Sequence, residues 1–274
     1  RDALAQGQLA GDGEFTKRCE RWLVDFIGAP AVLLTHSCTP ALEMAAILAG
    51  IDVGDEVIMP SFTFVSTANA VVLRGGVPVF VDIRPDTLNI DEELVAAAIT
   101  PRTKALLPIH YGGVPAEMDV LAEIGARHGL VLIEDAAQAL GSRYKGRKAG
   151  AIGQFAAFSF HETKNIISGE GGALAVNDPA LIERAEIVRE KGTNRKRFFR
   201  GQVDKYTWVD IGSSFLPGEL VAAFLYGQLE EREAIQKDRA ESWRLYDAAL
   251  RPYRNRGLRT PESPDHCEPN HHLY

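Results

Sequence analysis

Short apolar runs alternate with segments of helical spacing between residues 31 and 137. The runs are rich in valine, isoleucine and leucine, which favours buried strands. The segments between them often end at glycine, as helices do. This βα repetition predicts an α/β fold with a mainly parallel sheet and helices on both faces. Strands are expected at 31–35, 55–60, 77–82, 104–110 and 130–137, and helices at 39–50, 64–76, 91–99 and 117–129.

The alternation changes beyond residue 150. Two short apolar runs at 155–160 and 172–176 predict strands. A segment with proline near its start, at 179–192, predicts a helix. A longer stretch of helical spacing at 217–251 predicts one continuous helix.

Length and composition fit a globular protein with one large domain or two modest ones. The chain has 274 residues, of which 46% are hydrophobic and 24% charged, and its formal net charge is −7. Such an acidic chain argues against a nucleic-acid partner. We predict a large domain over 1–251 and the start of a small C-terminal domain over 252–274. The chain begins without methionine, and we expect it to be part of a longer protein.

The three cysteines, Cys19, Cys38 and Cys267, are too few and too scattered for a disulfide framework or a zinc site. No apolar run approaches the roughly 18 residues of a membrane span, and no signal-peptide pattern opens the chain. We therefore expect a cytoplasmic protein with no metal site and no membrane partner.

The first unusual loop, "THSCTPALE" at 35–43, joins a strand end to a helix start. Its small hydroxylated residues lie where the free backbone N–H groups of a helix N-terminus favour a phosphate. The alternative is an ordinary helix cap by Ser37 or Thr39. No Walker motif and no G-x-G-x-x-G motif is present, so the usual nucleotide-binding loops are not indicated.

The second loop, "IEDAAQALGS" at 133–142, places Asp135 at the end of a buried strand. A carboxylate in that position is costly unless it has a partner. Two interpretations stay open: Asp135 caps a following helix, or it holds a cation or a protonated ring nitrogen. Gln138 lies three positions on, and one helical turn would bring it to the same site.

The third loop, "FSFHETKN" at 158–165, ends a core strand with a single lysine, Lys164, and the glycine-rich "SGEGGALAV" follows at 168–176. Most lysines in loops are simply solvated. A partly desolvated lysine, in contrast, loses proton affinity and becomes a nucleophile toward an aldehyde. The glycines would let backbone approach such a site closely.

Together the three loops supply what pyridoxal phosphate (PLP) requires. The helix N-terminus takes the phosphate, the carboxylate keeps the pyridine nitrogen protonated, and the lysine binds the aldehyde. An aromatic side chain from "PSFTFVSTANA" at 60–70, Phe62 or Phe64, would cover one face of the ring. A lysine-dependent aldolase would need neither the carboxylate nor the phosphate cradle.

Six motifs occur in the order typical of the DegT/DnrJ/EryC1/StrS aminotransferases, which the chain resembles from residue 7 onward. The resemblance implies fold type I of the PLP enzymes and transamination of a nucleotide-linked sugar. A related branch dehydrates sugars and carries histidine in place of the lysine, so Lys164 argues against it. A regulatory protein that kept the fold and lost turnover stays open. The motifs are "PSFTFVSTANAV", "FVDIRPDTLNID", "PIHYGG", "IEDAAQALGS", "FSFHETKN" and "GEGGAL".

The resemblance also implies roles for single residues. Lys164 stands where the family has the catalytic lysine that bonds the cofactor, and Asp135 where it has the partner of the ring nitrogen. The other implied cofactor residues are Gln138 beside the ring, Phe64 stacked on it, and Cys38, Thr39 and Ser159 at the phosphate.

Finer features resemble the branch that aminates TDP-4-keto-6-deoxy-D-glucose to TDP-4-amino-4,6-dideoxygalactose, a step of cell-surface polysaccharide biosynthesis, with L-glutamate as donor. An acceptor keto group at C3, or a UDP-linked sugar, stays open. The basic stretch "REKGTNRKRFFRGQ" at 189–202 is either a solvated loop or a receiver for a phosphorylated small molecule. The family further implies a homodimer with sites built from both chains. The candidate substrate residues are Arg195, Arg197, Arg200, Tyr206 and Ser214, the last standing where the family has an asparagine.

Overall fold

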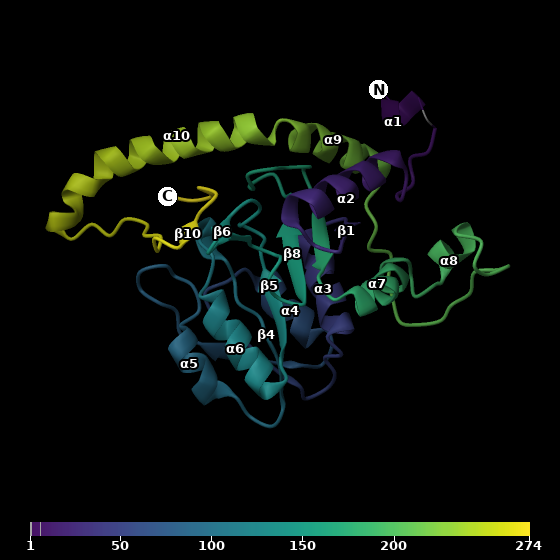
Figure 1. The fold of residues 1–274 in the computed structure, drawn as a ribbon, viewed down its shortest axis with the longest axis horizontal. Helices are drawn as coiled ribbons and strands as arrows, with labels where there is room; N and C mark the ends of the chain where they lie inside the picture. The colour runs from purple at the N-terminus through teal and green to yellow at the C-terminus, as the bar shows by residue number, and fades with distance from the viewer. Residues whose placement is uncertain (1, 6) are drawn as a thin grey trace.

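A seven-stranded sheet lies at the centre of the computed structural model, which describes residues 2–5 and 7–274 (Figure 1). The strand order is β1-β9-β8-β5-β4-β2-β3, and β9 runs antiparallel to both of its neighbours while the other described pairs are parallel. The predicted α/β class with a mainly parallel sheet is confirmed. The strands are β1 (Ala31–Thr35), β2 (Glu56–Pro60), β3 (Val77–Val81), β4 (Thr103–Leu106), β5 (Val131–Asp135), β8 (Phe155–Ser159) and β9 (Gly172–Val176).

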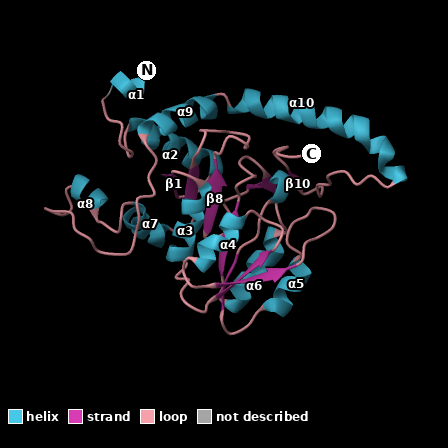
Figure 2. Cartoon of the chain, turned by 180° about the vertical axis from the view of Figure 1, so that it is seen from behind, coloured by secondary structure: helices cyan, strands magenta, loops and turns pink. Residues whose placement is uncertain are grey.

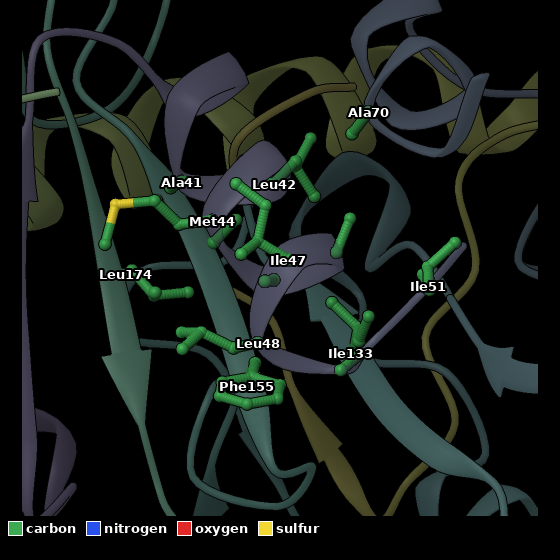
Figure 3. Packing of buried hydrophobic residues seen from close by; sticks show 14 of the residues in the cluster. Ala41, Leu42, Met44, Ile47, Leu48, Ile51, Ala70, Ile133, Phe155 and Leu174 are labelled. Carbon is green, nitrogen blue, oxygen red and sulfur yellow. The ribbon is translucent and has the colours of Figure 1, made fainter. Parts of the chain in front are cut away.

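Both faces of this sheet are buried, which explains why its strands are apolar throughout rather than alternating. Leu33 of β1 packs with α3 (Cys38–Leu48) on one face, whereas Val32 and Leu34 pack with α2 (Glu14–Ile27) and α9 (Glu219–Glu230) on the other. Figure 3 shows the first face, where Met44, Ile47 and Leu48 of α3 meet side chains of β8 and β9. The helix α3 thus lies over the centre of the sheet, with its N-terminus at the ends of the strands.

The remaining helices flank this core. The helices predicted at 64–76, 91–99 and 117–129 are present with slightly shorter bounds, whereas none was predicted at 2–5, 14–27 or 195–199. The predicted helix at 179–192 is shorter, because a 3-10 turn, Pro179–Leu181, precedes the regular helix. The other described helices are α1 (Asp2–Ala5), α4 (Val65–Val72), α5 (Glu92–Ala98), α6 (Met118–His128), α7 (Ile182–Arg189), α8 (Arg195–Phe199) and α10 (Arg232–Leu250), with 3-10 turns at Tyr111–Gly113 and Arg251–Arg256.

The predicted single helix at 217–251 is wrong. Two helices, α9 and α10, meet at Glu231, whose dihedral angles (φ −91°, ψ 8°) interrupt the helical path. Acidic residues favour a helix start over a helix end, so Glu231 and Glu233 suit the beginning of α10. The helix α9 packs on α2, whereas α10 extends across one end of the molecule (Figure 1).

A small second sheet connects the C-terminal residues to the body of the protein. Its order is β10-β6-β7, formed by Cys267–Glu268, Arg143–Tyr144 and Arg147–Lys148. The boundary at residue 252 between two domains therefore stays a prediction, since the last residues of the chain return to the large domain. Within the described ranges, no helix is both long and apolar enough to cross a bilayer.

Candidate active site

A cavity of about 480 Å³ opens at the carboxyl ends of the parallel strands. The register there places Gly172, the first residue of the antiparallel strand β9, opposite both Thr35 and Ser159. The ends of β1, β5 and β8 therefore meet at one edge, where open α/β sheets bind ligands. All seven predicted cofactor residues line this cavity: Cys38, Thr39, Phe64, Asp135, Gln138, Ser159 and Lys164.

The N-terminus of α3 forms one wall with its first backbone N–H groups uncapped. Ser37 is extended (φ −161°, ψ 175°), and its side chain makes no capping hydrogen bond, so the alternative of an ordinary cap by Ser37 is wrong. The Thr39 hydroxyl instead pairs with Ser66 Oγ at 2.7 Å. Burial raises the pKa of the Cys38 thiol, which keeps it neutral and adds no negative charge. This wall is suited to an anion.

Gly172 allows the chain to form this wall. A Cβ at that position would lie 2.4 Å from the backbone carbon and oxygen of Ser37 and 2.5 Å from the nitrogen of Cys38. Only glycine permits so close an approach of β9 to the start of α3.

Asp135 lies at the floor of the cavity, 5% exposed, with two hydrogen bonds. The Thr67 hydroxyl donates to Oδ2 at 2.8 Å, and the Ala137 backbone N–H donates to Oδ1 at 3.1 Å. Burial raises the pKa of Asp135, although these bonds and the nearby Lys164 oppose the rise. These contacts do not fully offset the cost of burying the ionised carboxylate, so the site favours a positively charged partner.

The chain after Asp135 is a series of turns rather than a helix, so the alternative that Asp135 caps a following helix is wrong. Gln138 reaches the cavity through this turn. Its Oε1 accepts a hydrogen bond of 2.6 Å from the Gly112 N–H, which leaves the amide NH₂ group for a ligand.

Lys164 is positioned by a turn between β8 and β9. Its N–H donates to the His161 carbonyl at 2.9 Å, while the Glu162 N–H donates to Gly169 O at 2.9 Å. His161 also lines the cavity, where its Nδ1 lies 3.0 Å from the Thr163 hydroxyl and its Nε2 3.6 Å from Glu170. The lysine, which lies in the turn after β8, thus lines the same cavity as Asp135.

Phe64, the predicted stacking residue, and Tyr111 both border the cavity. Phe64 lines it but is 74% exposed, at the start of α4. Tyr111 also lines it, and its ring packs on Phe62 with centroids 4.7 Å apart. The stacking role of Phe64 therefore stays a prediction.

Thr67 is the main residue of the site that the sequence did not reveal. It is fully buried, holds Asp135 and lies 2.7 Å from the Thr63 hydroxyl. The signal was the hydroxyl-rich "TFVST" at 63–67, because Thr63, just before α4, and Thr67, in its first turn, are four positions apart and their hydroxyls meet.

The predicted substrate residues lie outside this cavity within the chain. The helix α8 sits on long loops, on the opposite side of the molecule from the C-terminus (Figure 2). Acidic residues of the same chain pair with its arginines: Arg195 with Glu190 at 3.8 Å, Arg197 with Glu183, and Arg200 with Glu186 at 2.8 Å. Tyr206 packs on Phe198, and Ser214 is exposed at a bridge to Glu190.

The family model of the DegT/DnrJ/EryC1/StrS aminotransferases matches residues 1–274. The chain belongs to this family. Its fold is that of the fold type I PLP-dependent aminotransferases, its cofactor is pyridoxal 5'-phosphate, and its enzyme class is that of the transaminases.

Three relatives illustrate the match. The spore coat polysaccharide biosynthesis protein SpsC of Bacillus subtilis is 37% identical, covering 100% of this chain and 70% of its own. The GDP-perosamine synthase of Caulobacter vibrioides is 36% identical, over 90% of this chain and 65% of its own length. The structure of Spr1654 from Streptococcus pneumoniae in its PLP form is 27% identical, with a TM-score of 0.88, and covers 100% and 72%. The chain thus spans between 65% and 72% of these proteins' lengths.

The residues present fit PLP. The buried carboxyl of Asp135 is matched to a protonated pyridine nitrogen, the N-terminus of α3 and Ser159 to the phosphate, and Lys164 to the aldehyde. When bound, PLP supplies an aldehyde carbon for an amine and a ring that takes up electron density.

Proposed function

We propose that this protein transfers the amino group of L-glutamate to the keto group of a nucleotide-linked sugar. The observation that carries the proposal is the convergence of Lys164, Asp135 and the N-terminus of α3 on one cavity. The nitrogen leaves glutamate, which becomes 2-oxoglutarate, and the sugar ketone becomes an amine. SpsC and GDP-perosamine synthase support a role in amino-sugar and surface-polysaccharide biosynthesis through their names.

Each side chain has a defined task in this proposal. Lys164 would bond the aldehyde carbon of PLP and, as a free amine, would move a proton at the carbon of the amino donor. Asp135, held by Thr67, keeps a positive charge at the floor of the cavity. The neutral Cys38 and the hydroxyls of Thr39 and Ser159 surround the phosphate end.

The proposed acceptor is TDP-4-keto-6-deoxy-D-glucose, with TDP-4-amino-4,6-dideoxygalactose as product. The support is the likeness of the stretch 191–208 to enzymes of that activity, with its arginines as diphosphate ligands. A GDP-linked acceptor is the second candidate, because a relative 36% identical to the chain is a GDP-perosamine synthase.

We propose a homodimer as the working unit, placed in the cytoplasm. The basic residues of α8 lie outside the cavity of their own chain, so they would have to reach the cavity of a partner. Phe64, which lines the cavity, and the next residue, Val65, are 74% and 65% exposed, which favours cover by a second chain. The three cysteines are all free, as a reducing compartment requires.

The test offers L-glutamate with TDP-, GDP- and UDP-linked 4-keto-6-deoxy sugars, and the 3-keto isomer of the TDP-sugar, to the PLP-loaded protein. Product is followed by mass spectrometry and its configuration by NMR. We expect amination of the TDP-linked 4-keto sugar. Preference for the GDP-linked sugar would replace the acceptor and keep the reaction, whereas amination of no keto sugar would refute the function.

Substitution of the basic residues tests the partner role. Arg197→Glu and Arg200→Glu should raise the KM for the sugar more than they lower kcat, since diphosphate contacts persist from ground state to transition state. If the KM is unchanged in both variants, the basic residues do not bind the sugar nucleotide and the stretch is a solvated loop. Sedimentation velocity, in which activity follows the dimer rather than the monomer, checks the assembly.

A further inference from the structure

The C-terminal residues 270–274 lie directly against the loop that carries Lys164. Figure 1 shows this end of the chain returning to the body of the protein beneath α10. The residue that follows the lysine, Asn165, is 7% exposed and faces this segment with both ends of its amide. Its Nδ2 donates to the Asn270 carbonyl at 2.8 Å, and its Oδ1 lies 2.8 Å from His272 Nδ1.

The polarity of this contact is fixed by its atoms. Because Asn165 Nδ2 is spent on a carbonyl, its Oδ1 is the acceptor, and His272 Nδ1 must carry the proton. Burial and the nearby positive charges of Lys164 and Arg239 lower the pKa of His272 to about 4, so the imidazole is neutral at pH 7. A neutral ring beside Lys164 does not repel the lysine's ammonium form.

Asn270 connects the same segment to the loop after Asp135. Its side-chain Nδ2 donates to the carbonyls of Gln138 at 2.9 Å and Leu140 at 3.1 Å, and its backbone N–H donates to Ser142 Oγ at 3.1 Å. Gly113 makes room for it, because a Cβ there would lie 1.9 Å from Asn270 Oδ1.

The helix α10 contributes two further contacts to this network. Arg239 Nη2 donates to the Lys164 carbonyl at 3.0 Å, and Gln236 Nε2 donates to the Asn270 carbonyl at 2.7 Å. The carbonyl of Lys164 is therefore held by α10, and the side chain of the next residue, Asn165, is held by the C-terminal segment.

We propose that Asn165 and His272 are positioning residues that fix the backbone of Lys164, and that through Asn270 they tie the lysine loop to the loop of Asp135 and Gln138. The segment 270–274 would thus set the lysine at a constant place relative to the ring-binding residues. This inference deepens the proposed function and rests on Lys164 being the lysine that bonds PLP.

The first test measures backbone hydrogen exchange in the PLP-free protein, for the wild type, Asn165→Ala and His272→Ala. Both variants should raise the exchange rates of the amides in 161–166 and in 268–274 together, by about tenfold. Asn177→Ala is the matched control, because that amide also donates two hydrogen bonds, to the carbonyls of Gly150 and Gly153, but outside the lysine loop. Faster exchange in 268–274 alone would overturn the proposal.

The second test measures PLP itself. The dissociation constant should rise about tenfold in Asn165→Ala and His272→Ala, and the fraction of Lys164 labelled after borohydride reduction should fall, while Asn177→Ala leaves both unchanged. His272→Asn should restore them, because an asparagine Nδ2 replaces the donor Nδ1 of histidine. Equal losses in Asn177→Ala would reduce the effect to general stability and overturn the proposal.

The two tests separate this inference from the proposed function. A protein that binds no PLP but shows the coupled exchange would refute the function and keep the physical link between the two segments. A protein that aminates a keto sugar with all variants equal to wild type would keep the function and refute the positioning role.

Discussion

The hydroxyl of Thr67 donates a 2.8 Å hydrogen bond to Oδ2 of Asp135, and both side chains are buried. Thr67 belongs to α4 and Asp135 ends β5, so the bond fixes the carboxylate relative to a neighbouring helix. Because the Ala137 N–H takes the other oxygen, Asp135 is oriented from two sides. A carboxylate so held is ready for a positive ring without further reorganisation.

Thr67→Val removes this bond while keeping the shape of the side chain. We expect kcat to fall about tenfold, since a hydrogen bond to a charged group is worth about 1.5–3 kcal/mol and part of it is recovered by relaxation. Steady-state kinetics with glutamate measure the effect. Thr63→Val is the control, because it removes only the neighbouring hydroxyl pair and should cost less. Equal losses would mean that Asp135 does not depend on Thr67.

Asp135→Asn should separate stability from function. Turnover should fall on the order of a hundredfold, because an amide does not hold the ring nitrogen protonated. A near wild-type rate would show that Asp135 is only structural.

The same variant has an expected pH signature in the PLP-free protein. Burial raises the folded-state pKa of Asp135, so the wild type loses stability as pH rises from the unfolded value of 3.8 through the higher folded value. The asparagine variant lacks this loss and should be the more stable of the two at neutral pH. Urea denaturation at several pH values between about 4 and 8 measures the difference in free energy of unfolding between the two proteins. A variant that is less stable at pH 7 would contradict this sign.

The sequence predicted the parts of the site that end strands. Asp135 and Lys164 are conspicuous because a charge at the end of an apolar run is costly, and strand ends of a parallel sheet meet at one edge. The α/β fold was predictable as well, because the alternation of strands and helices is visible in short stretches of sequence. The family resemblance added Cys38 and Ser159, which no spacing singles out, and chose Phe64 over Phe62.

What stayed hidden depends on distant parts of the chain. Thr67 has the pattern of an ordinary helix residue, and only the packing of α4 beside β5 turns it to Asp135. Asn270 and His272 follow a run without periodicity, so their return to Lys164 was not predictable from sequence. The break at Glu231 was missed because no glycine or proline marks it.

Lys164→Ala should lower turnover by about four orders of magnitude or more, as loss of a covalent nucleophile does. The visible absorbance of the lysine-bound cofactor should vanish with it. Lys148→Ala is a fitting control, because burial and nearby arginines lower the pKa of Lys148 to about 8, which makes it a second reactive amine. If the absorbance persists in Lys164→Ala and disappears in Lys148→Ala, then Lys148 rather than Lys164 bonds the cofactor.

Glu134, beside Asp135 on β5, is expected to stabilise the fold rather than to act in catalysis. Its fully buried carboxylate pairs with His110 Nε2 at 2.8 Å and accepts the N–H groups of Gly150, Ile152 and Gly153 at 2.6 to 2.8 Å. Burial raises its pKa, but these contacts together outweigh burial, and the net pKa is lowered.

Glu134→Gln should therefore cost about 3 kcal/mol at pH 7, because an amide NH₂ would face backbone donors. A carboxylate with a lowered pKa stabilises fully above its unfolded value of 4.5 and loses this as pH falls through the folded value. The difference in free energy of unfolding between wild type and variant should thus be constant above about pH 5, which is about half a unit over the unfolded pKa, and should shrink at lower pH. Glu123→Gln, an exposed partner of Arg127, should change stability by less than about 0.5 kcal/mol.

Gly172→Ala tests the phosphate wall. The new Cβ would lie within 2.5 Å of Ser37 and Cys38 backbone atoms, so β9 and the start of α3 must move apart, at a cost of about 2 kcal/mol in stability. Because that movement displaces the N–H groups that face the phosphate, the affinity for PLP should fall about tenfold more than the affinity for pyridoxal, which lacks the phosphate. Gly227→Ala is the matched control, since a Cβ there meets nothing within 4 Å and lies in a helix that favours alanine. Equal losses for both ligands would place the phosphate elsewhere in the cavity.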